Sequence, residues 1–131
     1  MCIIRILKPN SNVALVWNSR DSSSQLVIEN AEICRNLCPL FKGFSGGIEN
    51  TPEIFDQFFR HGKYEYRTFR NDIEYNLDSF IGRNLSDSHA PKSTDSKYKE
   101  FVKALTELFM KYSTDEKIVL PSITKSYIGK V

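Results

Sequence analysis

The chain has 131 residues, of which 40% are hydrophobic and 12% aromatic, a size and composition that support one globular domain spanning residues 1–131. Its 18 basic and 16 acidic residues leave a net charge of +2, so charge gives no reason to expect a nucleic acid or an anionic membrane as partner. No apolar run approaches the roughly 20 residues that span a bilayer, and the N-terminus has no secretory leader, so we expect a cytoplasmic protein.

The first residues have the pattern of a helix end. Ile3 and Leu7 have helical spacing, and Pro9 stops the helix before it is long enough to be stable alone, so we expect a longer element of which only the tail is present. The next segment, VALVW, begins at Val13 and ends at Trp17 and is continuously apolar. This pattern is typical of a strand covered on both faces, as in a parallel sheet flanked by helices.

Two helices are expected before the middle of the chain. The first covers residues 23–38, is capped by a serine and ends before Pro39. The second covers residues 51–62, with Thr51 as its cap and Gly62 closing it.

An alternating segment, KYEYRTFR, then predicts a strand over residues 63–70 with at least one wet face. Asn76 is expected to cap a short helix that carries Leu77, Phe80 and Leu85. The polar stretch that follows, SDSHAPKSTDS, is expected to be a loop.

The clearest helical pattern is SKYKEFVKALTELFMKYS, over residues 96–113, with Asp95 or Ser96 at the cap. The last strand is expected over residues 118–129, broken or bulged near Pro121.

Metal binding has weak support in the linear sequence. His61 and His89 are far apart and lack the spacing typical of zinc ligands. Cys34 and Cys38 are one helical turn apart and could hold half a site, but both lie in the apolar stripe of their helix. We therefore interpret these two cysteines as reduced core residues and expect no metal.

Other candidate chemistry is equally weak. The glycines of KGFSGG follow a helix, whereas a phosphate cradle lies between a strand and a helix, so we interpret this segment as a loop. Ser86 and Ser88 lie beside His89 in a turn-rich segment, without the strand-turn-helix elbow of a nucleophile. No acidic pair has a spacing that forces two carboxylates together, so no catalytic residue is identified.

Three passages together resemble the C-terminal half of a class I S-adenosylmethionine-dependent methyltransferase. RILKPNSNVALVWNSRD is similar to the helix end, "LKPGG" turn and fifth strand of that superfamily, with Asn10 and Ser11 where two glycines are usual. SDSHAPKSTDSKYKEFVKALTELFMKY resembles a segment with "SYAP" and a long helix in one branch of these enzymes, where His89 replaces the tyrosine. IVLPSITKSYIGKV is similar to the last strand of that branch.

The resemblance implies an α/β fold, a partial Rossmann-like methyltransferase fold with flanking helices. Residues 13–17, 63–70 and 118–129 would be the fifth, sixth and seventh strands. They would form a three-stranded mixed sheet in the order 5-7-6, with the seventh strand antiparallel to its neighbours. The implied function is the substrate-side half of an enzyme that transfers a methyl group to an unknown small molecule.

The same resemblance sets limits on cofactor and activity. The "GxGxG" turn and the acidic residue that bind S-adenosylmethionine in the family have no counterpart in this sequence. S-adenosylmethionine is thus implied by resemblance only, and we expect this chain alone neither to bind it nor to be active. The alternative is a non-catalytic homodimeric remnant or a small-molecule-binding protein.

Candidate substrate contacts follow from the rule that ligands of open α/β sheets bind near the carboxyl ends of the parallel strands. Trp17, Asn18 and Arg20 lie at the end of the first strand, and Arg83 and Ser86 lie in or before the later loop. The alternative for each is a structural role.

Without a fourth strand beside it, the strand from Val13 to Trp17 becomes an apolar edge with no charge or proline, which natural sheets normally avoid. We expect it to pair with a second chain, either another copy or a separately encoded N-terminal half.

Overall fold

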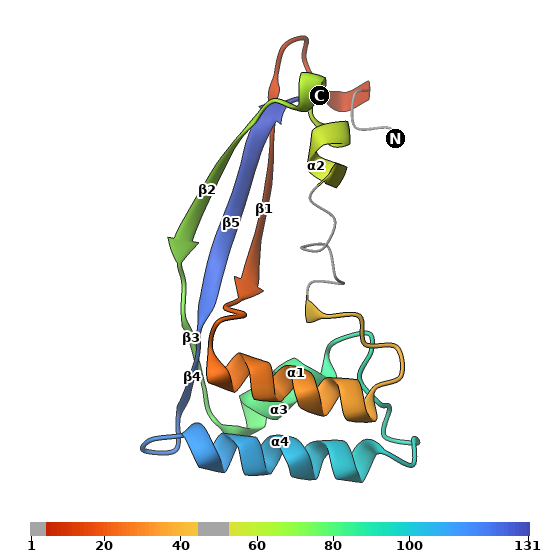
Figure 1. Cartoon of the computed structure of the whole chain (residues 1–131), viewed down its shortest axis with the longest axis vertical. Coiled ribbons are helices and arrows are strands. Elements are labelled where there is room, and N and C mark those ends of the chain that lie inside the picture. The colour runs from red at the N-terminus through yellow and green to blue at the C-terminus, as the bar shows by residue number, and fades with distance from the viewer. Residues whose placement is uncertain (1–4, 45–52) are drawn as a thin grey trace.

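The computed structural model describes residues 5–44 and 53–131 and has a mixed α/β architecture. A three-stranded sheet lies toward one end of the long axis, and a group of helices lies toward the other (Figure 1). None of the described helices has both the length and the apolar character needed to cross a membrane.

The larger sheet has the C-terminal strand at its centre. Its strands β1 (Asn12–Arg20), β5 (Ser122–Lys130) and β2 (Tyr64–Arg70) adjoin in the order β1-β5-β2. Both pairings are antiparallel. The prediction of a mixed sheet is therefore wrong, because the described sheet is antiparallel throughout, although the C-terminal strand has the two neighbours that were predicted.

Strand β1 has one buried side and one exposed side. The side chain of Val13 is 8% exposed, whereas that of Val16 is 58% exposed. The prediction that this strand is covered on both faces is wrong for the described residues, because helix α2 (Glu53–Phe58) packs on one face only. Strand β1 is also an edge strand, hydrogen-bonded to β5 alone among the described strands.

A cluster of aromatic rings fills the covered face. Phe55 of α2 stacks on Tyr127 of β5 with ring centroids 4.0 Å apart, and Trp17 of β1 stacks on the same tyrosine at 5.1 Å. Helix α2 ends at Phe58, earlier than predicted, and a 3-10 turn, η3 (Arg60–Gly62), follows. His61 within this turn has a non-helical φ of 55°. The predicted start of this helix at Thr51 lies outside the described residues.

The predicted break near Pro121 is confirmed and divides the last strand between two sheets. Strand β4 (Ile118–Leu120) precedes the proline and pairs with β3 (Ile73–Tyr75). Strand β3 was not predicted, because three residues are too few for an alternating pattern.

The helical body consists of α1 (Gln25–Leu37), α3 (Leu77–Leu85) and α4 (Tyr98–Tyr112). Asn76 caps α3 as predicted, accepting a hydrogen bond from the Ser79 amide in a capping box. Helix α4 has Lys97 at its N-cap, so the prediction of Asp95 or Ser96 is wrong. The Asp95 carboxylate instead accepts the Lys92 amide at 2.7 Å and shapes the preceding loop.

The main hydrophobic core lies between these helices and β4. Its largest fully buried side chains are Phe80, Phe101, Leu105 and Ile118. The two buried cysteines, Cys34 and Cys38, belong to the same core, as the sequence predicted.

An ionic cluster connects the end of β1 with β2. The Asp21 carboxylate accepts hydrogen bonds from the Ser23 hydroxyl at 2.6 Å and from Arg70 at 2.7 Å. The Ser23 hydroxyl, the Arg70 guanidinium and the Ser23 amide lower the pKa of Asp21 from 3.8 to about 2.

This cluster predicts a loss of stability in acid. Since the lowered pKa belongs to the folded state, Asp21 stabilises the fold above pH 3.8, and this contribution disappears as the pH falls toward 2. We expect Asp21→Asn to lower the free energy of unfolding at pH 6 by less than about 1 kcal/mol, since the pair is screened by solvent. The difference between wild type and variant should shrink at pH 2.5 in urea unfolding, and a constant difference would contradict the assignment.

Candidate functional site

A cleft of about 730 Å³ lies where the C-terminal end of β1 meets the segment after α1 and the loop after α3. It is lined by Trp17, Asn18, Arg20, Leu40, Lys42, Gly43, Phe44, Arg83, Asp87, Ser88 and His89. Segments distant in sequence therefore form a single concave surface, the usual setting of a small-molecule site.

Arg20 is the central charged group of the cleft and is only 8% exposed. Its guanidinium carbon lies 3.9 Å from the centroid of the Phe44 ring, in a cation–π arrangement. The same guanidinium lies 3.7 Å from the Asp87 carboxylate. Burial, with the nearby Arg83 charge, lowers the pKa of Arg20 to about 10, so the side chain remains a cation at neutral pH.

Helix α3 holds this cation through Asn84, which is 1% exposed. The Asn84 amide nitrogen donates to the Phe80 carbonyl at 3.0 Å, which fixes its oxygen toward Arg20 at 3.4 Å. Asp87 also accepts a hydrogen bond from Arg83 at 2.8 Å, so one carboxylate faces two guanidinium groups. With Lys42 on the rim, cations outnumber carboxylates along the cleft, which favours an anionic ligand.

We expect Asn84→Ala to destabilise the protein by about 1–2 kcal/mol, because the buried guanidinium of Arg20 loses an acceptor. A matched control is Asn71→Ala, since the Asn71 amide donates to Thr124 at an exposed position. The control should change the free energy of unfolding by less than about 0.5 kcal/mol. Urea unfolding of both variants measures the difference. Equal losses of unfolding free energy would mean that the hydrogen bond from Arg20 to Asn84 does not stabilise the fold.

Trp17 and Asn18 line the cleft from the end of β1. The Trp17 indole donates to the Ser19 hydroxyl at 3.1 Å, and the Asn18 side-chain oxygen accepts from Thr124 at 3.2 Å. These contacts fix both side chains before any ligand is bound.

Four of the five residues selected from the sequence line this cleft, namely Trp17, Asn18, Arg20 and Arg83. Ser86 is not part of the lining, and its hydroxyl donates to the Arg83 carbonyl at 2.7 Å. Sequence reasoning did not select Lys42, Phe44 or Asp87. Of these three, only Asp87 could have been expected from the sequence, because it directly follows the selected residue Ser86.

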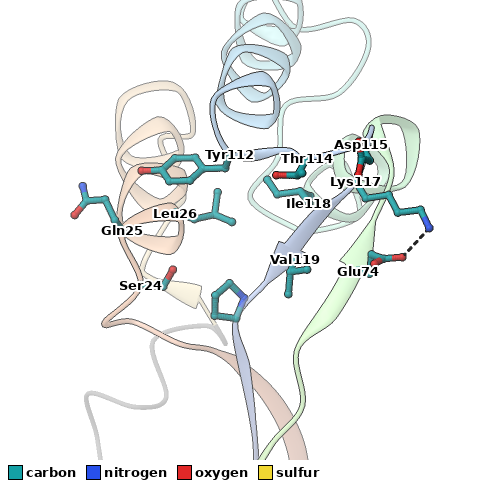
Figure 2. A pocket seen from close by; sticks show the side chains of 11 residues that line it. Ser24, Gln25, Leu26, Glu74, Tyr112, Thr114, Asp115, Lys117, Ile118 and Val119 are labelled. Atoms are coloured by element: carbon teal, nitrogen blue, oxygen red, sulfur yellow. Dashed lines mark ion pairs between the residues drawn. The ribbon is translucent and has the colours of Figure 1, made fainter.

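A second cleft, also of about 730 Å³, lies between the start of α1, the end of α4 and β4 (Figure 2). Figure 2 shows Glu74 and Lys117 at one side of it, joined by an ion pair of 3.3 Å. Both side chains are more than half exposed, so this cleft has no buried charge comparable to Arg20. We therefore take the cleft around Arg20 as the candidate site.

The fit of S-adenosylmethionine to the described residues is poor. A cofactor cradle of this kind needs a glycine turn between a strand and a helix N-terminus. The connection from β1 to α1 is Asp-Ser-Ser-Ser, without glycine, and the described glycines with positive φ, Gly43 and Gly62, follow helices.

His89 lies next to the two buried cysteines, although 51 residues separate it from Cys38 along the chain. The ligand atoms of Cys34, Cys38 and His89 all lie within 4.8 Å of one another. The prediction that both cysteines are core residues is confirmed, but no spacing in the sequence predicts that His89 lies beside them.

No protein-family model matches the chain, and no curated protein matches it.

Proposed function

We propose that this chain is the acceptor-binding half of a class I S-adenosylmethionine-dependent methyltransferase, with a small organic acid as the methyl acceptor. The cofactor-binding residues would come from outside this sequence, so the isolated chain is inactive. The observation that carries the proposal is the gathering of Trp17, Asn18, Arg20 and Arg83 around one cleft at the carboxyl end of β1.

The arrangement of the larger sheet supports the family. The resemblance implied that the C-terminal strand lies between the other two, antiparallel to both, and β5 has this position between β1 and β2. The antiparallel pairings alone are compatible with other α/β folds, so the Rossmann-like assignment remains part of the proposal.

The charge of the cleft supports the class of acceptor. Arg20, Lys42 and Arg83 give it a positive potential that Asp87 offsets only in part, and the rings of Trp17 and Phe44 offer apolar contact. A carboxylate attached to an apolar group matches both features.

Benzoate and its neutral isostere benzamide test this assignment by NMR titration of the full chain. We expect benzoate to shift the Trp17 indole resonance and the amides at the end of β1, and benzamide to do so at least about tenfold more weakly, since charge complementarity is lost. Arg83→Gln should weaken benzoate binding, whereas Arg35→Gln on the exposed side of α1 should not. Equal binding of the two probes would refute an anionic acceptor.

Isothermal titration with S-adenosylmethionine tests the other part of the proposal. We expect no binding by the isolated chain, because the described residues provide no glycine cradle between a strand and a helix. Binding by the chain would show that the cofactor residues have been wrongly assigned.

A second candidate function is self-association through β1, without catalysis. The observation that favours it is the edge of β1, which no other described strand covers, together with Val16, which is 58% exposed. Pairing of two copies through β1 would extend the sheet and satisfy the backbone groups along this edge.

Val16→Lys tests this association by placing like charges close together in a symmetric pair of strands. We expect the association constant in sedimentation velocity to fall at least about tenfold. The control is Val119→Lys in β4, where the valine is 50% exposed, and it should leave association unchanged. A wild-type chain that remains monomeric at high micromolar concentration would exclude this function.

A further inference from the structure

A cluster of two cysteines and one histidine, Cys34, Cys38 and His89, lies at the C-terminal end of α1. Cys34 is the last cysteine within the helix, and Cys38 is its C-cap residue, whose amide donates to the Cys34 carbonyl at 2.8 Å. This hydrogen bond fixes the turn and keeps both thiols on one side of the helix. The loop after α3 brings His89 to the same place, so two different elements provide the three groups.

The three side chains are shielded from solvent to a similar degree. Cys34 is 0% exposed, Cys38 is 2% exposed, and the side chain of His89 is 13% exposed. His89 also lines the cleft around Arg20, so the cluster is adjacent to that cleft. A small ion could reach the cluster from this side.

The separations suit a tetrahedral metal ion. Zinc binds cysteine sulfur at about 2.3 Å and histidine nitrogen at about 2.0 Å, so two ligands of one ion are roughly 3.3–3.8 Å apart. The ligand atoms here lie within 4.8 Å of one another, so side-chain movements of about 1 Å would complete the geometry.

Unpartnered polar atoms give an independent sign that something is bound here. In the described part of the chain, three buried side-chain atoms have no hydrogen-bond partner, namely Asn30 Nδ2, Asp87 Oδ2 and His89 Nε2. Two of them belong to residues beside the thiols, because Asn30 contacts Cys34 at 3.8 Å and His89 is grouped with both cysteines. Asp87 Oδ2 lies 3.9 Å from His89 Nε2 and 3.7 Å from the Arg20 guanidinium. Such unsatisfied atoms are costly in a core that binds nothing.

We propose that Cys34, Cys38 and His89 bind one zinc ion, with a water molecule in the fourth position toward the cleft around Arg20. This site is independent of the proposed methyltransferase function and holds whether or not the cleft binds a methyl acceptor.

Metal binding would also give hydrogen-bond partners to buried polar atoms that have none now. The Cys34 thiol contacts the oxygen of the Asn30 amide. Once Cys34 is a thiolate it needs a donor, and rotation of the Asn30 amide would present Nδ2, which has no partner now. His89 Nε2 lies 3.9 Å from Asp87 Oδ2, so Nε2–H would donate to Asp87 as an outer-shell carboxylate and Nδ1 would bind the zinc.

The charge and proton balance of the site is simple. Zinc displaces one proton from each thiol and releases both to solvent, and the ion with two thiolates and a neutral imidazole has no net charge. Burial raises the pKa of the Cys34 thiol to about 12, so without metal the group remains a thiol. No oxidant or reductant is needed.

Cobalt(II) titration of the reduced, metal-stripped full chain tests the proposal. We expect one equivalent to produce thiolate-to-cobalt charge-transfer bands and the intense d–d bands of tetrahedral coordination, both abolished when zinc is added. Cys34→Ser and Cys38→Ser should remove the charge-transfer bands or halve them. His89→Gln should weaken cobalt binding at least about tenfold, since even outer-shell changes cost this much.

Matched controls use the remaining cysteine and histidine of the chain. Cys2→Ser, at a position outside the described residues, and His61→Gln should leave the cobalt spectrum and affinity unchanged. Zinc should also raise the thermal midpoint of the wild type more than that of His89→Gln. Circular dichroism would verify that this variant is folded. The absence of tetrahedral bands in the wild type, or their loss in either control, would overturn the site.

Discussion

Replacing Phe101 with alanine is expected to lower the free energy of unfolding by about 3–5 kcal/mol. Phe101 in α4 is 0% exposed and packs in the core formed by α1, α3, α4 and β4. Its truncation removes apolar contacts and leaves a cavity that the surrounding side chains fill only in part. Urea unfolding followed by circular dichroism measures the loss.

The matched control is Met110→Ala in the same helix, where the methionine is 64% exposed. Because no cavity forms at the surface, this change should alter stability by less than about 0.5 kcal/mol. Similar losses in the two variants would mean that α4 does not bury the face containing Phe101.

The sequence predicted best the elements whose signals are local. Helix α4 follows from its apolar spacing, and the start of α3 follows from Asn76, which satisfies amides within its own first turn. The break at Pro121 is equally local, since proline has no amide hydrogen to donate.

The errors concern features that depend on distant parts of the chain. The residues from Val13 to Trp17 have the composition of a strand buried on both faces, but burial depends on what packs against a strand, and α2 covers only one face. The N-cap at Lys97 is a similar case, because Asp95 is used in the loop that precedes α4. Tertiary contacts decided both outcomes.

In the candidate site, too, the residues with a local sequence signal were predicted and those that depend on distant contacts were not. Trp17, Asn18 and Arg20 were selected because they follow an apolar strand, and a strand end is recognisable in sequence. The approach of His89 to the cysteines depends on how the loop after α3 folds over the end of α1, and no local spacing predicts that.

Gly129 is required by close packing at the centre of the larger sheet. It lies in β5 opposite Val13 of β1 and Tyr64 of β2. A Cβ atom at this position would lie 2.7 Å from the Lys63 carbonyl oxygen and 2.7 Å from the Phe59 ring. The Phe59 side chain is 2% exposed, so it has little room to move.

We therefore expect Gly129→Ala to destabilise the protein by about 1–3 kcal/mol, since either the ring or the backbone of the neighbouring strand must shift. Gly82→Ala is the matched control, because no atom lies within 4 Å of the added Cβ in α3. There alanine favours the helix and should stabilise the protein by about 0.5–1 kcal/mol. Opposite signs in urea unfolding would establish that packing makes glycine necessary at position 129. Stabilisation by both changes would mean that the Phe59 ring does not lie against β5 at Gly129.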